Sequence, residues 1–184
     1  MTIDQARALM NEWTQSLALR VHMECVAACM GAYAEKLDPS QKDRWVVAGL
    51  LHDMDYERHP SQEAGHPFVA VGLLRSMGVD EEILTAILGH AEYSGTPRTT
   101  RMARALFAVD ELAGFIVACA KVRPNGVADL EPPSVKKKLK DKGFAAAVSR
   151  EDIRKGAAEL GVDETEHVRT CIDAIRSERG RLGV

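Results

Sequence analysis

The sequence has few aromatic residues and no strong excess of charge of either sign. Its 184 residues include two Trp, three Tyr and four Phe, and the formal net charge is -3 with a pI near 6.1. Proteins that bind nucleic acid usually show a basic stripe, often with aromatic rings on which bases stack. We therefore expect no nucleic-acid polymer among the partners of this chain.

The sequence also lacks a disulfide-dense cysteine pattern and long hydrophobic runs. The four cysteines are scattered through apolar stretches without the dense spacing of a disulfide scaffold, which predicts reduced core thiols in a reducing compartment. No apolar run approaches the roughly 20 residues that a membrane span needs, and the first residues lack a basic segment followed by an apolar core. The sequence therefore predicts a cytoplasmic protein with no membrane partner.

Hydrophobic residues make up 46% of the chain and follow a helical periodicity. They recur at spacings of three and four, and no long run alternates with a period of two. This pattern predicts an all-α protein of about 7–9 helices, and the length suits a single domain over residues 1–184. We expect helices at about 3–13, 17–37, 68–77, 80–91 and 99–122, one between Ser40 and His52, and two that start near Ser149 and Asp163.

Four of the six histidines form an ordered series with two aspartates. The members of the series, each on or beside a different helical segment, are His22, His52, Asp53, His66, His90 and Asp110. Mixed imidazole and carboxylate ligands suit Fe, Mn, Co, Ni or Zn, whereas Ca and Mg favour oxygen ligands alone. We therefore expect a site for one or two divalent transition-metal ions.

The order of these residues resembles the HD-domain superfamily of metal-dependent phosphohydrolases, whose signature is a first His, a central His-Asp doublet and a distant Asp. The matching residues are His22, His52-Asp53 and Asp110, and the doublet stands in Gly49-Leu50-Leu51-His52-Asp53, a form typical of that family. The resemblance covers about residues 17–122 and extends more loosely to the C-terminus, where the chain is similar to small bacterial HD proteins. It implies a helical HD bundle with a metal-binding core at about 17–122 and a helical extension at about 134–180.

The same resemblance implies roles for the ligands. His22, His52, Asp53 and Asp110 would bind one metal ion, and Asp53 would bridge to a second ion held by His66 and His90. Two ions about 3.5–4 Å apart stabilise the attacking and leaving oxygens of a phosphoryl transfer and lower the pKa of bound water. The leading prediction is a metal-dependent phosphohydrolase in which a metal-bound hydroxide attacks a small phosphate ester or nucleotide.

Further residues are candidates for catalysis or substrate binding. Asp55, two residues after the doublet, is placed to assist as a general base alongside Asp53. Arg98 and Arg101 follow the turn after the last histidine of the series, and Lys137 belongs to a basic stretch at 136–142 that follows a proline-rich flap. Such cations would meet the phosphate of the substrate.

Two other functions stay open. Some members of the HD superfamily use the same six ligands as a mixed-valent di-iron centre that activates dioxygen. Those proteins have a longer stretch between the last His and Asp than the nineteen residues that separate His90 from Asp110, so the shorter interval favours hydrolysis. A non-catalytic module that binds a metal or a ligand is the third option, although none of the ligands is missing. A homodimer is compatible with all three.

Overall fold

The chain folds into ten α-helices and two short 3₁₀ turns, with no β-strand. The computed structural model describes all 184 residues. The helices are α1 (Ile3–Trp13), α2 (Leu17–Leu37), α3 (Lys42–Leu51), α4 (Phe68–Ser76), α5 (Glu81–His90), α6 (Arg101–Lys121), α7 (Pro132–Leu139), α8 (Arg150–Leu160), α9 (Glu164–Ser177) and α10 (Arg179–Leu182). The all-α prediction is confirmed, and its helices up to α6 begin and end close to the expected residues.

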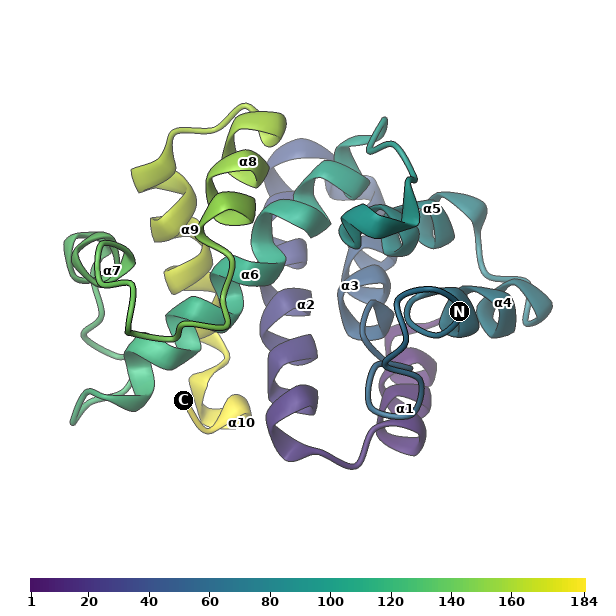
Figure 1. Ribbon diagram of the computed structural model, residues 1–184, viewed down its shortest axis with the longest axis horizontal. Coiled ribbons are helices and arrows are strands. Elements are labelled where there is room, and N and C mark those ends of the chain that lie inside the picture. Colours follow the sequence, from purple (N-terminus) through teal and green to yellow (C-terminus); the bar gives the residue numbers. More distant parts are fainter.

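The two longest helices, α2 and α6, position the others. Figure 1 shows α1, α3, α4 and α5 on one side of α2 and α7, α8 and α9 on the other. Helix α3 packs along α2, helices α5 and α8 pack along α6, and α9 packs against α2. Because α2 and α6 are covered from several directions, both are rich in buried residues and read as strongly apolar in the sequence.

Two glycines allow helices to approach each other closely. A Cβ atom on Gly49 of α3 would lie 2.7 Å from Ala27 Cα on α2, and a Cβ atom on Gly156 of α8 would lie 2.5 Å from Ala108 Cα on α6. Glycine in a helix costs about 1 kcal/mol relative to alanine. Close packing explains both positions, and the first of them brings the end of α3 against α2.

The segment expected to be a flap followed by a basic stretch contains α7. Its first residues, Pro132 and Pro133, suit the first turn of a helix, where the missing amide hydrogen would have no partner inside the helix. Pro132 and Val135 are buried, and they anchor α7 to the rest of the molecule. Prolines that look like a linker in the sequence therefore mark the start of a helix.

Helices on both sides of residue 122 share one core. A single cluster of 46 buried apolar residues extends from Ala6 of α1 to Leu182 of α10. It includes residues of α9 that face α2, such as Cys171, whose backbone carbonyl lies 3.8 Å from Cys29 Sγ. None of the helices is both long enough and apolar enough to span a lipid bilayer.

Candidate metal centre

Six side chains converge from α2, α5, α6 and the segment that joins α3 to α4. They are His22 on α2, His52 and Asp53 at the end of α3, His66 before α4, His90 at the end of α5, and Asp110 in the middle of α6. The imidazoles of His52, His66 and His90 are almost completely buried. The structure thus brings together the whole series of ligand-type residues seen in the sequence.

One group of atoms gathers around His22 Nε2. This nitrogen lies 3.0 Å from Asp110 Oδ1 and 3.2 Å from His52 Nε2, and Asp53 Oδ2 lies 3.6 Å from it. His52 Nε2 is in turn 3.5 Å from Asp53 Oδ2 and 3.4 Å from Asp110 Oδ1. Ligand atoms bonded to a transition metal at about 2.0–2.2 Å lie about 3–3.5 Å from one another. These four residues have the spacing of a ligand set.

The second group uses the other oxygen of the same aspartate. Asp53 Oδ1 lies 3.3 Å from His66 Nε2 and 3.5 Å from His90 Nε2, and the two nitrogens are 3.1 Å apart. Since Oδ2 faces the first group and Oδ1 faces the second, the carboxylate of Asp53 has the arrangement of a bridging ligand. The geometry therefore gives two adjacent groups of ligand-type atoms that share one aspartate.

The tautomers of His66 and His90 show that the second group suits a cation. His66 Nδ1 lies 2.8 Å from the carboxylate of Asp55, and His90 Nδ1 contacts the carbonyl oxygen of Ile87. Both partners are acceptors, so each Nδ1 carries a hydrogen and each neutral ring has its lone pair on Nε2. Two lone pairs that face each other at 3.1 Å repel unless a proton or a cation lies between them. The donor set therefore fits a bound metal ion.

Asp55 supports the metal centre from behind. It is fully buried, its Oδ1 accepts the hydrogen bond from His66 Nδ1, and its Oδ2 accepts the backbone N–H of Ala70 at 2.7 Å. Both oxygens are engaged, and Asp55 does not line the pocket beside the metal ligands. The geometry therefore does not place Asp55 as the general base that its sequence position suggested. Instead it fixes the ring of His66, as carboxylates behind metal-binding histidines commonly do.

The charges of the cluster shift the titration of its members. Burial opposes the charged form of the His52 imidazole, but the carboxylates of Asp53 and Asp110 outweigh it and raise the pKa of His52 to about 9. Burial likewise tends to raise the pKa values of Asp53 and Asp110, yet the neighbouring histidines hold both below the usual range. Two ionised carboxylates in a buried site need positive charge nearby, which protons or metal ions can supply.

The cluster opens into a pocket of about 530 Å³. Apart from the metal-site side chains, its polar lining consists of Tyr56, Gln62, Glu92, Tyr93, Glu111 and Asp152. No lysine or arginine lines it. Burial and the adjacent Asp110 raise the pKa of Glu111 to about 7. Sequence reasoning missed these wall residues, although the position of Glu111 next to Asp110 and of Tyr56 just after the doublet was a local signal for two of them.

The three cations expected to bind substrate lie elsewhere. Arg98 forms ion pairs with Glu159 at 2.6 Å and Glu92 at 2.9 Å, and its guanidinium Cζ lies 3.7 Å from the centre of the Phe107 ring. Arg101 donates a hydrogen bond to a backbone carbonyl of α2, and Lys137 lines a different pocket between α7 and α8. Arg98 is thus neutralised by Glu92, six residues away, and by Glu159, whose distance in the sequence means that no local pattern could reveal it.

Comparison with known families agrees with this geometry. The family model described as HD domain matches residues 20–114, just over half of the chain. The chain therefore belongs to the HD-domain family, whose members are mostly metal-dependent hydrolases. Searches of curated proteins and of solved structures found no significant match. The matched range contains all six residues of the cluster.

Proposed function

We propose that the protein is a metal-dependent phosphohydrolase that acts on a small phosphate ester. The observation that supports this most directly is the position of Asp53, whose two oxygens face two separate groups of histidines. Two divalent ions held there would neutralise the charge that develops on a phosphoryl group and lower the pKa of a water molecule. Fe, Mn, Co, Ni and Zn all suit such ligands.

The residues divide the work of holding the two ions. His22, His52 and Asp110 would bind the first ion together with Asp53 Oδ2. His66 and His90 would bind the second together with Asp53 Oδ1. The rings are kept in place from behind, since His52 Nδ1 donates to the Gly49 carbonyl at 2.8 Å and His66 Nδ1 donates to Asp55. Such preorganised ligands leave the pocket side of each ion free for substrate.

The wall of the pocket favours a substrate with little negative charge beyond one phosphoryl group. Asp152 and the ionised form of Glu111 would repel a polyphosphate chain, since no basic side chain lines the pocket, whereas Glu92 is already paired with Arg98 and Lys155. Tyr56, Gln62 and Tyr93 offer neutral hydrogen bonds instead. Burial and nearby carboxylates raise the pKa of Tyr93 to about 12, so its phenol stays protonated. We propose a monophosphate ester with a neutral or cationic remainder as the preferred substrate.

The test is hydrolysis by protein loaded separately with Mn, Co, Ni, Fe or Zn, measured as phosphate released from a panel of sugar, amino-alcohol, nucleoside and aryl monophosphates. Asp53→Ala should release no phosphate and should lose bound metal, because Asp53 is the ligand that the two groups of metal-binding residues share. Glu63→Ala, which removes an exposed carboxylate in the same segment, is the matched control and should behave like the parent. Inactivity of the parent across the panel and all five metals, or turnover by Asp53→Ala, would overturn the proposal.

Dioxygen activation at a mixed-valent di-iron site is the second candidate, because four imidazoles shared between two positions also suit iron. Its signature is an EPR signal from the half-oxidised iron pair together with oxygen uptake that depends on substrate. Iron-loaded protein that shows both and releases no phosphate would replace hydrolysis with oxygenation.

A further inference from the structure

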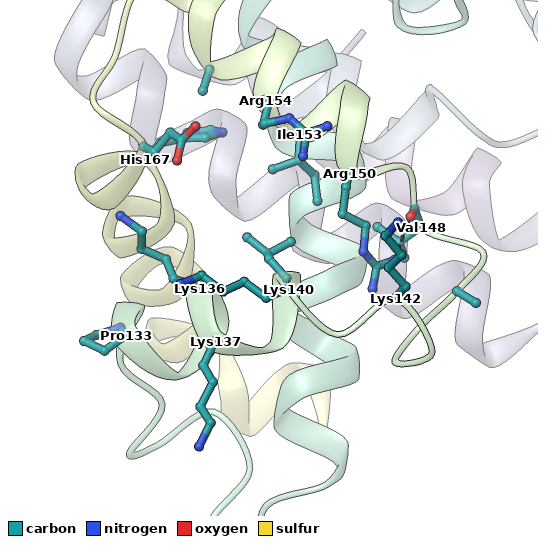
Figure 2. Close-up of a pocket in the computed structure, with 14 residues that line it drawn as sticks. Pro133, Lys136, Lys137, Lys140, Lys142, Val148, Arg150, Ile153, Arg154 and His167 are labelled. Atoms are coloured by element: carbon teal, nitrogen blue, oxygen red, sulfur yellow. Dashed lines mark hydrogen bonds between the residues drawn. The ribbon is translucent and has the colours of Figure 1, made fainter.

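A second pocket, separate from the metal centre, is lined by basic residues. It has a volume of about 800 Å³ and is formed by α7, the segment that follows it, α8 and α9. The cations that line it are Lys136, Lys137, Lys140, Lys142, Arg150 and Arg154. Glu164 is the one carboxylate that lines the same pocket. In Figure 2, Lys140 lies between α7 and α8, Lys136 extends toward α9 and His167, and Lys137 extends away from the other labelled cations.

These cations have no carboxylate partners. None of the six forms an ion pair, whereas Arg98, Arg176 and Arg181 elsewhere in the molecule each form at least two. The side chains of Lys140 and Arg154 are exposed and have no hydrogen-bond partner within the chain. Like charges gathered in a concave site repel one another, so an anion bound among them would relieve that repulsion.

Helical spacing and one half-buried arginine shape the basic pocket. Lys136 and Lys140 are four residues apart at the end of α7, and Arg150 and Arg154 are four residues apart on α8, so each pair lies on one helix face. Arg150 Nη1 donates to the carbonyl oxygens of Ala145 at 2.5 Å and of Val148 at 2.8 Å. The guanidinium therefore holds the segment before α8 in place, and that wall of the pocket is formed without a ligand.

The pocket has an apolar side as well as a basic one. Leu139, Val148, Ile153 and Ala157 line it together with the buried His167. We propose that this pocket binds a small polyanion with two or more phosphate groups and an apolar or ring-shaped part, of the nucleoside polyphosphate class. The phosphates would contact Lys136, Lys140, Lys142 and Arg154, and the remainder would cover the apolar side.

This ligand differs from the proposed substrate of the metal centre. Val148 is the one residue that lines both pockets, and the metal pocket has carboxylates where the basic pocket has cations. A polyphosphate would be repelled by the carboxylates of the metal pocket and attracted by the cations of the basic pocket. The basic pocket is therefore expected to bind its ligand whether or not the metal centre is intact.

Isothermal titration calorimetry of the purified protein with ATP tests the proposal. Lys140→Glu/Arg154→Glu should weaken ATP binding about 100-fold, as expected when two charge-assisted hydrogen bonds are lost. The control Lys121→Glu/Arg179→Glu has the same change of charge at two exposed positions outside the pocket and should bind ATP within about 3-fold of the parent, since distant surface charges are screened. Asp53→Asn should also bind like the parent.

Three results would overturn the proposal that the basic pocket binds a nucleoside polyphosphate. The first is no heat of binding with ATP, and the second is an affinity for ATP that is unchanged in the Lys140→Glu/Arg154→Glu variant. The third is loss of ATP binding in Asp53→Asn, which would assign ATP to the metal centre. Inorganic triphosphate and adenosine should each bind more weakly than ATP, because each lacks one half of the recognised ligand. Binding of a single-stranded oligonucleotide without binding of ATP would identify the pocket as a nucleic-acid surface instead.

Discussion

At the scale of single residues, we expect Asp55 to influence metal binding by His66 without itself being a ligand. Its Oδ1 holds His66 Nδ1 at 2.8 Å. In Asp55→Asn the amide can also donate to this nitrogen, so the ring loses its fixed tautomer. We expect the affinity of the second metal position to fall about 10- to 100-fold while the first is retained. Metal titration followed by elemental analysis measures both.

Glu63→Gln is the matched control for Asp55→Asn, since Glu63 lies exposed in the same segment, and it should leave both affinities unchanged. If Asp55→Asn bound two equivalents of metal with unchanged affinity and yet lost turnover, Asp55 would act on the substrate after all, and its assignment as a support for His66 would be wrong.

His167 makes folding sensitive to acid. Its Nε2–H donates to the Ala108 carbonyl at 2.9 Å, and its Nδ1 accepts the hydroxyl of Tyr33 at 2.5 Å, so the neutral ring is fully bonded. Burial lowers the pKa of His167 below its ordinary value of 6.5. Its contribution to stability is therefore complete above pH 6.5 and is lost as the pH falls below 6.5 through the lower folded-state value.

Urea unfolding between pH 8 and pH 5 measures this effect. His167→Gln should be less stable than the parent at pH 8 by about 1–3 kcal/mol, and the difference between the two should shrink as the pH falls. His59→Gln, which removes an exposed histidine, should follow the parent at every pH. A constant difference between His167→Gln and the parent would mean that His167 does not titrate in this range.

At the scale of helices, we expect the distance between α2 and α3 to control the first group of ligand-type residues, because His22 lies on α2 and His52 at the end of α3. A Cβ atom on Gly49 would lie 2.7 Å from the backbone of Ala27, and His52 follows three residues later. Gly49→Ala should push the two helices apart, destabilise the protein by about 1–3 kcal/mol and weaken metal binding, because His52 moves away from His22. Denaturant unfolding and metal titration on the same samples test this.

Gly72→Ala supplies the contrast. Gly72 is an exposed position of α4, and a Cβ atom there would have no neighbouring atom within 4 Å. Alanine at this position should therefore leave metal binding unchanged and raise stability by up to about 1 kcal/mol. Equal effects of the two substitutions would show that close packing of α3 on α2 does not control the site.

The helices also show what can be predicted from sequence. Helices α1 and α2 agree with their predicted ranges because N-cap residues Thr2 and Ser16 mark their starts and the apolar spacing is regular. Helix α7 falls mostly within the expected helical extension at about 134–180, but its own range was not predicted because its two prolines look like a linker, and its burial depends on contacts with α6 and α9 that no local pattern contains. The ligand series was visible because its residues follow one another in the order of a known family signature, whereas the buried contacts of Asp55 and the pairing of Arg98 with Glu159 depend on the fold.

At the scale of the whole molecule, the shared core predicts one cooperative unfolding transition. Trp13 lies in α1 and Trp45 in α3, so tryptophan fluorescence reports on the N-terminal helices. Far-ultraviolet circular dichroism reports on all ten helices. The two signals should give the same midpoint in urea. A second transition seen only by circular dichroism would mean that the helices after residue 122 form an independent unit.

Truncation of the chain also tests whether the helices after residue 122 are needed for cooperative folding. The HD match ends at residue 114, but α9 covers α2 and its His167 hydrogen bonds to Tyr33. A chain that ends at residue 131 would lose α7–α10 and expose the apolar faces of α2 and α6. We expect it to show no cooperative transition, because the buried apolar area that remains cannot offset the conformational entropy of the chain.

A chain that ends at Ser177 is the matched control. It lacks only α10, with the buried Leu182 and the 2.6 Å ion pair between Arg181 and Glu24, so it should fold with about 2–4 kcal/mol less stability and keep its metal ions. Cooperative unfolding and metal binding by the chain ending at 131 would show that the matched region folds without the last four helices. The C-terminal third would then be an addition to the metal-binding unit, and its basic pocket would belong to a part of the molecule that can evolve apart from the metal centre.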